Sequence, residues 1–250
     1  MALFDFFKKK KDKAEYIVNS AIEDKDDGIQ IPNTKDIKDY NLFREAATKF
    51  NLKLGDHIPK KALDECGKKL GMLEKNVLVF GSQNEAAILF DYCFFNFRIN
   101  KVNVIERYMM LSPPDVNSID YSVLQSKLNG HYSVFSIQEV VKNKGVVVRD
   151  IFYGKELFLI DIALSSSAKE KVAFAGYVVP FKQFYVSTGT LLILQDINSR
   201  DQVLSIIEKF LDKKDENGRL SANREASFSG QIIRTLLKSY DWEHSRYEEP

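Results

Sequence analysis

The chain has 250 residues, of which 44% are hydrophobic and 28% are charged, and its formal net charge is +1. This composition is typical of a globular protein, and so balanced a charge gives no general field that would attract a polyanion. No apolar run approaches the roughly 18 residues that cross a membrane, and the N-terminus has no apolar core of signal-peptide length. We therefore expect a cytoplasmic protein, and the composition argues against nucleic acid as its partner.

The first thirteen residues, MALFDFFKKKKDK, combine an apolar tip with a basic run. Aromatic side chains of such a tip enter the headgroup boundary of a bilayer, while the lysines contact anionic lipid. We therefore expect peripheral attachment to the inner face of the membrane through Leu3, Phe4, Phe6, Phe7, Lys8, Lys9, Lys10 and Lys11. The alternatives are a disordered leader and a tip that docks on its own domain. The opening MALFDFF resembles the membrane-targeting N-terminus of the bacterial Min-system topological specificity factor, which implies a shared way of touching a membrane.

Residues 36–130 are predicted to be mainly helical. Apolar residues recur at helical spacing, and favourable first residues mark several helix starts. Helices are expected around Tyr40–Phe50, from near Pro59, from the capping-box pair Ser82 and Glu85, over Val102–Leu111, and from Ser118 with Val123, Leu124 and Leu128 facing inward. Residues 74–80 fit either a short strand or a helical continuation, because periodicity does not separate the two.

The stretch from Tyr132 to Leu194 is predicted to contain five strands in an antiparallel meander. Its apolar runs are separated by four breaks rich in turn residues: Lys142–Gly145, Tyr153–Glu156, Ser165–Lys171 and Pro180–Gln183. In the third strand, Leu157–Leu164, both faces are largely apolar, so this strand is expected to be buried on both sides. Such a strand suits a small barrel, closed or half closed, or a curled sheet with helices on its outer face.

Two amphipathic helices are predicted after the strands, over Asp201–Leu211 and Arg224–Tyr240. The expected fold class is therefore α+β, with N-terminal helices, the barrel or curled sheet, and two C-terminal helices. Trp242 either folds back on the core or belongs to a free docking tail. The expected segments are a leader and connector (1–35), a helical region (36–130), a barrel-like region (131–195), and C-terminal helices with a tail (196–250), with 36–240 forming one packed unit.

Familiar catalytic and metal-binding patterns are missing from the sequence. Cys66 and Cys93 are far apart and have no histidine partners at ligand spacing, so neither a disulfide framework nor a zinc site is indicated. Neither a phosphate-binding glycine loop nor a nucleophile elbow is present. We therefore expect no metal, no cofactor and no catalytic residue that the sequence identifies.

The candidates for a ligand site are four polar residues near the ends of predicted strands, namely Arg149, Asp150, Asp161 and Ser165. A carboxylate among apolar neighbours needs a partner to offset its desolvation, and Arg149 is one candidate partner for Asp161. The serines at 165–167 could bind an anion through exposed N–H groups. The alternatives are a structural ion pair or turn-bracing hydrogen bond for the charged residues, and a flexible crossover for the serines.

The order of features from Glu85 to Leu194 resembles that of a group of uncharacterised bacterial proteins. The matching stretches are EAAILFDYCFF, NVIERYM, YSVFSIQEV, VVVRDIFYGKE, LFLIDIALSSSA and YVVPFKQFYVSTG. Some proteins of this kind carry a Cys-rich, metal-binding tail of the SEC-C type, but this chain lacks those cysteines, so the resemblance implies no metal here. It implies no activity either, and it supports treating the helices and the barrel as one unit.

These observations favour a non-enzymatic interaction or adaptor protein with an unknown protein partner. One alternative is a nucleic-acid-associated protein that stacks bases on barrel aromatics such as Tyr177, Phe184 and Tyr185. Another is an enzyme whose site is assembled from residues scattered along the sequence. The sequence leaves the oligomeric state and the identity of the partner open.

Deleting residues 1–13 tests the expected membrane contact. We expect the full chain to float with anionic liposomes but not with neutral ones, and the deleted chain to float with neither. Partial insertion of the aromatic tip contributes roughly 4 to 6 kcal/mol, so this binding should be reversible and weakened by salt. If both chains float equally, or if neither does, the N-terminal membrane contact is wrong.

Overall fold

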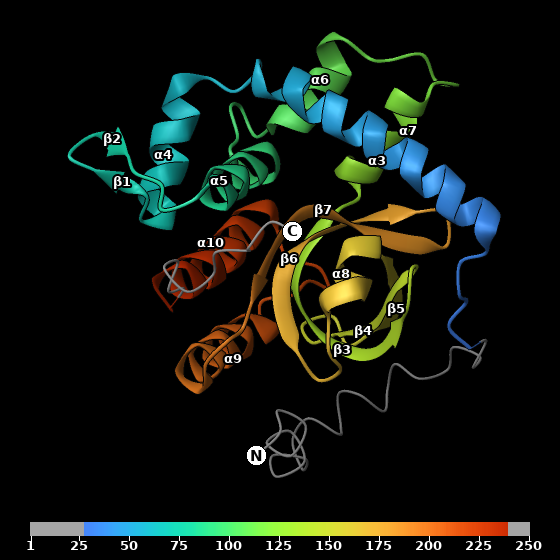
Figure 1. Ribbon diagram of the computed structural model, residues 1–250. Helices are drawn as coiled ribbons and strands as arrows, with labels where there is room; N and C mark the ends of the chain where they lie inside the picture. Colours follow the sequence, from blue (N-terminus) through green and yellow to red (C-terminus); the bar gives the residue numbers. More distant parts are fainter. Residues whose placement is uncertain (1–27, 240–250) are drawn as a thin grey trace.

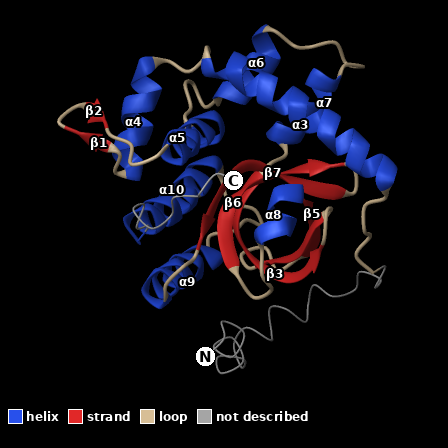
Figure 2. Cartoon of the chain, viewed as in Figure 1, coloured by secondary structure: helices blue, strands red, loops and turns tan. Residues whose placement is uncertain are grey.

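The computed structural model describes residues 28–239, except for the side chain of Thr190. It shows a five-stranded barrel with helices before and after it (Figures 1 and 2). The predicted α+β fold class is confirmed, and the barrel is closed. The predicted membrane-contact residues and Trp242 lie outside the described part of the chain. Within residues 28–239, no helix has both the length and the apolar character needed to cross a bilayer.

The barrel differs from a simple antiparallel meander in one pairing. Its strands are β3 (His131–Val141), β4 (Gly145–Asp150), β5 (Glu156–Ile160), β6 (Ala173–Phe181) and β7 (Phe184–Ile193). They follow one another around the barrel in the order β3-β4-β5-β7-β6, and β6 also pairs with β3. The pair β5 and β7 is parallel, whereas the other pairs are antiparallel as predicted. Closure leaves none of these strands with a free edge.

The third strand is shorter than predicted, because β5 ends at Ile160 and the helix α8 (Ile162–Ser167) follows at once. Asp161 is the N-cap of α8, and its Oδ1 accepts a hydrogen bond from the Leu164 N–H at 2.9 Å. A side-chain acceptor here satisfies a free N–H group of the first helical turn, which favours a helix over a continued strand. The serine-rich segment predicted to be a loop therefore starts within a helix.

The barrel wall alternates between an inner and an outer face. Val146 and Val148 belong to the apolar cluster that fills the barrel, whereas Val147 between them belongs to a cluster outside it. Leu164 of α8 packs against the inner cluster, and α8 lies over one end of the barrel (Figure 1). Both faces of the wall are thus covered by apolar side chains, as the sequence predicted for the third strand.

Two groups of helices cover the outer face of the barrel (Figure 1). One group contains α4 (Lys60–Leu70), α5 (Gln83–Asn96), α9 (Ile197–Leu211) and α10 (Ala222–Ser239). The other contains α3 (Thr34–Gly55), α6 (Val104–Leu111) and α7 (Ile119–Leu128). Within the ambiguous residues 74–80 the chain forms a strand pair, β1 (Leu73–Glu74) with β2 (Val77–Leu78).

The two serine caps predicted from the sequence are present. Ser82 Oγ accepts from the Glu85 N–H at 3.3 Å, and Ser118 Oγ accepts from the Tyr121 N–H at 3.1 Å. The carboxylate of Glu85 completes the first cap by accepting from the Gly81 N–H, one residue earlier than a standard capping box requires.

The start of β4 tolerates only glycine. Gly145 has φ +158°, and a Cβ built on it would lie 2.1 Å from the carbonyl oxygen of Leu159 on β5. A backbone oxygen in a paired strand cannot move aside cheaply. Gly154, in the turn between β4 and β5, also has a positive φ of +74°, but a Cβ there would have no atom within 4 Å beyond its own chain neighbours.

We expect Gly145→Ala to lower the free energy of unfolding by roughly 3 kcal/mol or more, from backbone strain together with the steric clash. Gly154→Ala should cost only about 1 to 2 kcal/mol, because it has the strain without the clash. Urea unfolding of the two variants measures the difference. Equal losses would show that the close approach of β4 and β5 does not constrain Gly145.

Candidate functional site

The four sequence-predicted site residues do not meet in one place. The register pairs Gly145 with Ile160 and Arg149 with Glu156, so Asp161 and Arg149 lie at opposite ends of the β4–β5 hairpin. That offset corresponds to about 13 Å along the strands. The candidate ion pair between Arg149 and Asp161 is therefore wrong, because the hairpin register keeps the two side chains apart.

Asp150 is a structural carboxylate that braces the turn after β4. Its side chain is 1% exposed and accepts hydrogen bonds from the Ser133 hydroxyl at 2.5 Å and from the N–H groups of Phe152 and Tyr153 at 3.0 and 2.9 Å. His131 Nε2 lies 3.1 Å from its other oxygen. Ser133 is 0% exposed, so its hydroxyl is out of reach of a substrate and cannot act as a nucleophile in this arrangement. The turn-bracing alternative explains Asp150.

Asp161 and Ser165 are also occupied by local contacts. Besides capping α8, Asp161 accepts a hydrogen bond from the Ser187 hydroxyl on β7 at 2.8 Å. The Ser165 hydroxyl donates to the Ile162 carbonyl at 2.7 Å within α8. The Asp161–Ser187 bond ties the start of α8 to β7, while the Ser165 bond stays within α8.

Two of the aromatic residues considered for base stacking are inside the protein. Tyr177 is 2% exposed and stacks on Phe95 of α5 with ring centroids 4.3 Å apart. Phe184 is 1% exposed and lies in the cluster between the barrel and α3. Both rings therefore pack against protein side chains rather than offering a surface to a base.

Cys66 and Cys93, far apart in sequence, lie side by side between α4 and α5 as free, buried thiols. The hydrogen bond with Cys66, followed by burial, raises the pKa of the Cys93 thiol. Among the residues that the structure describes, no group of three or more His, Cys, Asp or Glu side chains is placed to hold a metal ion.

A cavity between α3, α7 and the β6–β7 part of the wall is the candidate ligand site. The space in it that a water-sized molecule can occupy is about 50 Å³. The lining side chains are apolar on the barrel side and mixed on the helical side: Phe43, Arg44, Ala47, Thr48, Asn51, Val123, Lys127, Val179, Val186, Ser187 and Thr188. A mostly apolar cavity with a few polar groups is the usual form of a small-molecule site.

Lys127 of α7 is the unusual member of this lining. It is only 3% exposed, and its Nζ forms no hydrogen bond with any residue that the structure describes. The Nζ lies 5.8 Å from the ring centroids of both Phe94 and Phe95. Burial lowers the pKa of Lys127, and the carboxylate of Asp91 opposes that shift. A buried ammonium without an acceptor is costly, so the cavity has a position where an acceptor would be stabilising.

The other polar groups of the cavity differ in how far they are already satisfied. Ser187 donates to Asp161 and Thr188 donates to Asp91 at 2.6 Å, so both hydroxyl protons are used. Arg44 is a hydrogen-bond partner of the Tyr40 hydroxyl. The Oδ1 atom of Asn51 is buried and has no hydrogen-bond partner among the described residues. Lys127 and the remaining N–H groups of Arg44 are therefore the unused donors of the site, whereas the unpaired oxygen of Asn51 is enclosed.

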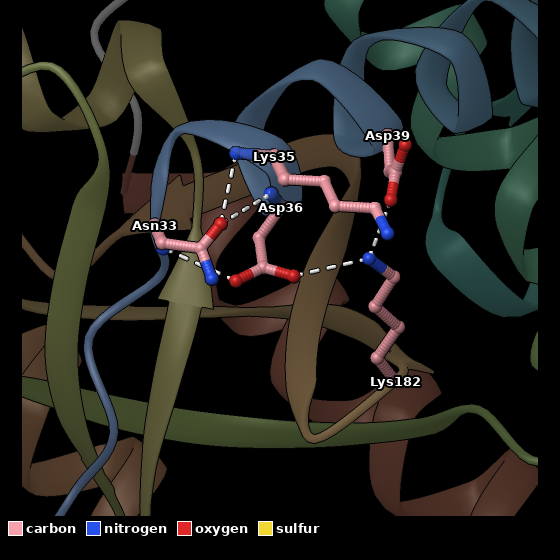
Figure 3. A network of polar contacts seen from close by, with 5 residues as sticks. All are labelled: Asn33, Lys35, Asp36, Asp39 and Lys182. Carbon is pink, nitrogen blue, oxygen red and sulfur yellow. Dashed lines mark hydrogen bonds and ion pairs between the residues drawn. The ribbon is translucent and has the colours of Figure 1, made fainter.

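Ion pairs hold α3 over the cavity at both of its ends. At the N-terminal end, Lys182 from the β6–β7 turn points toward two carboxylates of α3, with Nζ 3.0 Å from Asp36 and 2.6 Å from Asp39 (Figure 3). At the C-terminal end, Lys53 Nζ lies 2.9 Å from Asp120 of α7. The segment of α3 between these contacts lines the cavity.

The Lys182 contacts change the titration of both partners. Hydrogen bonding to Lys182, with a second bond from the Asn33 N–H, lowers the pKa of Asp36 from its usual 3.8. Hydrogen bonds to Asp39 and Asp36 raise the pKa of Lys182 from its usual 10.5. Asn33 accepts in return from the Asp36 N–H at 3.1 Å, so the helix cap and the ion pairs form one network.

Residues 34–229 match a family described as a family of unknown function (DUF7986). The chain belongs to this family. Comparisons with curated proteins and with solved structures found no match. The matched part of this DUF7986 protein includes the whole barrel and the helices that line the cavity. The family description gives no activity, so the function has to be argued from the site.

The sequence did contain a signal for Lys127 that familiar motifs do not capture. Val123 and Leu124 were expected to face inward, and Lys127 follows them by four and three residues, so it belongs to the same helical face. Because this face of α7 was expected to point inward, the position of Lys127 on it predicts a buried lysine in this DUF7986 protein. Asn51 and Arg44 give no such signal, because polar residues are ordinary on an exposed helix such as α3.

We expect Lys182→Met to destabilise this DUF7986 protein, because it leaves Asp36 and Asp39 without their cation. The contribution of Asp36 is present above pH 3.8 and is lost as pH falls through its lowered pKa. The contribution of Lys182 is present below pH 10.5 and is lost as pH rises through its raised pKa. The difference in melting temperature from the parent should therefore be largest between these limits and shrink in acid and in strong base.

Lys155→Met is the matched control, since Lys155 is exposed in the β4–β5 turn and its side chain makes no ion pair within the described chain. It should leave the pH profile of the melting temperature unchanged. A Lys182→Met difference that does not depend on pH would contradict the electrostatic explanation.

Proposed function

We propose that this protein is a non-enzymatic binding protein and that the cavity below α3 is its ligand site. The observation that carries the proposal is Lys127, a buried lysine that lines the cavity and has no hydrogen-bond acceptor among the described residues. Burying an ionised amine typically costs several kcal/mol unless other groups compensate it. A ligand that supplies an acceptor would regain part of that cost on binding.

The chemistry of the lining supports binding over catalysis. The hydroxyls of Ser187 and Thr188 donate to the carboxylates of Asp161 and Asp91, and Asp161 is at the same time the N-cap of α8. The lining contains neither histidine nor cysteine. The lining therefore has neither a thiol nucleophile nor an imidazole base, the groups that most often carry nucleophilic catalysis.

The interaction role expected from the sequence is part of this proposal. A binding protein that catalyses no reaction has its effect through a partner that recognises its ligand-bound form. The helix α3 could serve this purpose, because it belongs both to the ligand site and to the protein surface. One face of α3 lines the cavity, while Leu42 and Leu52 on the same helix are 58% and 73% exposed. A ligand that contacts α3 would stabilise the position of this helix on the barrel. A protein partner that binds the exposed face of α3 would then distinguish the ligand-bound form from the free form.

Filling the cavity tests the proposal. Ala47→Met places a flexible side chain from α3 into the site. We expect small molecules that bind the full chain, found by ligand-observed NMR with neutral, cationic and anionic fragments, to bind this variant at least about tenfold more weakly. Asn41→Met, on an exposed position of α3 outside the lining, is the matched control and should bind them like the parent.

Melting temperatures of both variants establish that they are folded. If the fragments bind Ala47→Met as well as the parent, they bind elsewhere and the site assignment is wrong. If no fragment of any charge binds the parent, the proposed binding function fails.

A further inference from the structure

We infer that Lys127 is a site of reversible covalent attachment, through an imine, for a small neutral aldehyde or ketone of about three to five non-hydrogen atoms. The inference rests on the proposed function and adds the chemical class of the ligand and its point of attachment. Three properties of the cavity lead to it: the position of the lysine amine, the balance of charge around it and the small size of the space.

The amine of Lys127 is surrounded by protein and yet remains within reach of a small molecule. The side chain is 3% exposed and lines the cavity, and its Nζ forms no hydrogen bond with a described residue. The unpaired polar atoms that are fully enclosed within residues 28–239 include Asn51 Oδ1 but not Lys127 Nζ, so the amine keeps contact with open space. A lysine becomes a nucleophile when it loses its proton, and burial lowers the pKa of Lys127.

The charges around the cavity are already balanced, so the ligand should bring none. Asp91 of α5 acts on Lys127, while Arg44 of α3 and Asp161 both act on the Tyr40 hydroxyl. An anionic ligand would add an uncompensated negative charge to this partly buried group of two cations and two carboxylates. A protonated imine carries the same single positive charge as the ammonium group, so Asp91 remains opposite a cation after a neutral ligand has reacted.

The size of the cavity limits the ligand to a few atoms. The space that a water-sized molecule can occupy is about 50 Å³, and one water needs about 10 to 15 Å³ of such space. Acetaldehyde, propanal and acetone are within this limit, whereas benzaldehyde exceeds it. The apolar side chains of the wall, among them Val123, Val179 and Val186, suit the alkyl groups of these small compounds.

The reaction is a condensation that needs neither an oxidant nor a reductant. The lone pair of the neutral amine forms a bond to the carbonyl carbon, and a proton moves from nitrogen to oxygen to give a carbinolamine. The proton that the ammonium group had released then protonates this hydroxyl, the C–O bond breaks, and water leaves. The balance is therefore ammonium plus carbonyl compound giving iminium plus water, with the same charge on both sides.

The test traps the iminium in the full chain. The protein is mixed with acetaldehyde, propanal or acetone and with sodium cyanoborohydride, which delivers hydride to the iminium carbon and leaves a stable secondary amine. Peptide mass mapping then gives the labelling rate of each lysine. Near neutral pH we expect Lys127 to be labelled at least about tenfold faster than the exposed Lys38, whereas an unreactive buried lysine would be labelled more slowly. This advantage should shrink in strong base, where exposed lysines are deprotonated as well.

Two comparisons confine the reaction to the cavity. Benzaldehyde is too large for the space, so it should label Lys127 no faster than Lys38. Ala47→Met, which fills the cavity, should slow the labelling of Lys127 by acetaldehyde at least about tenfold and leave Lys38 unchanged. The exposed control Asn41→Met should leave both rates unchanged. Comparing Lys127 with Lys38 in the parent chain keeps the test valid even if a variant is poorly folded.

The inference is overturned if Lys127 is labelled no faster than Lys38, or if benzaldehyde labels Lys127 as fast as acetaldehyde does. It is also overturned if Ala47→Met leaves the labelling of Lys127 unchanged, because the aldehyde would then reach the amine from outside the cavity. In each of these cases the proposed function stands as long as other fragments bind the parent and Ala47→Met excludes them. If neither a fragment nor a carbonyl compound binds the parent, the proposed function fails as well.

Discussion

Closure of the barrel depends on one short contact, the parallel pairing of β5 with β7, whose register joins Leu159 to Tyr185 and Ile160 to Val186. Without this contact β5 and β7 would both be free edges of an open sheet. The closed wall is apolar on both faces, so it needs side chains inside and helices outside. The position of α3, and with it the cavity, follows from that requirement, because α3 covers the outer face next to β6 and β7.

Two buried polar groups show how a structural residue differs from a candidate binding residue. Asp150 was an obvious candidate in the sequence, yet its carboxylate is satisfied by Ser133 and by backbone N–H groups, and it has nothing left to offer a ligand. Lys127 was not a candidate, yet its ammonium is buried without a hydrogen bond among the described residues and faces a cavity. Unused hydrogen-bonding capacity, rather than charge or burial alone, separates the two.

Much of the fold could be predicted because its signals are local. Glycines in the turns marked the ends of the strands, serines marked two helix starts, and the alternation of apolar residues placed the third strand inside the protein. The site could not be predicted in the same way. Its polar members come from α3, α7 and β7, which are far apart in sequence, and the four residues chosen from sequence neighbours lie instead at opposite ends of one hairpin.

The sequence by itself determined that this protein is α+β, with five strands between two sets of helices, since local periodicity and turn chemistry are enough for that. Tertiary structure alone decided that β5 ends at Ile160, that β5 and β7 run parallel, and that Cys66 lies beside Cys93. It also decided which polar groups are satisfied. These are properties of pairs of segments, and the free energy of such contacts depends on a register and a distance that no local stretch of the chain specifies.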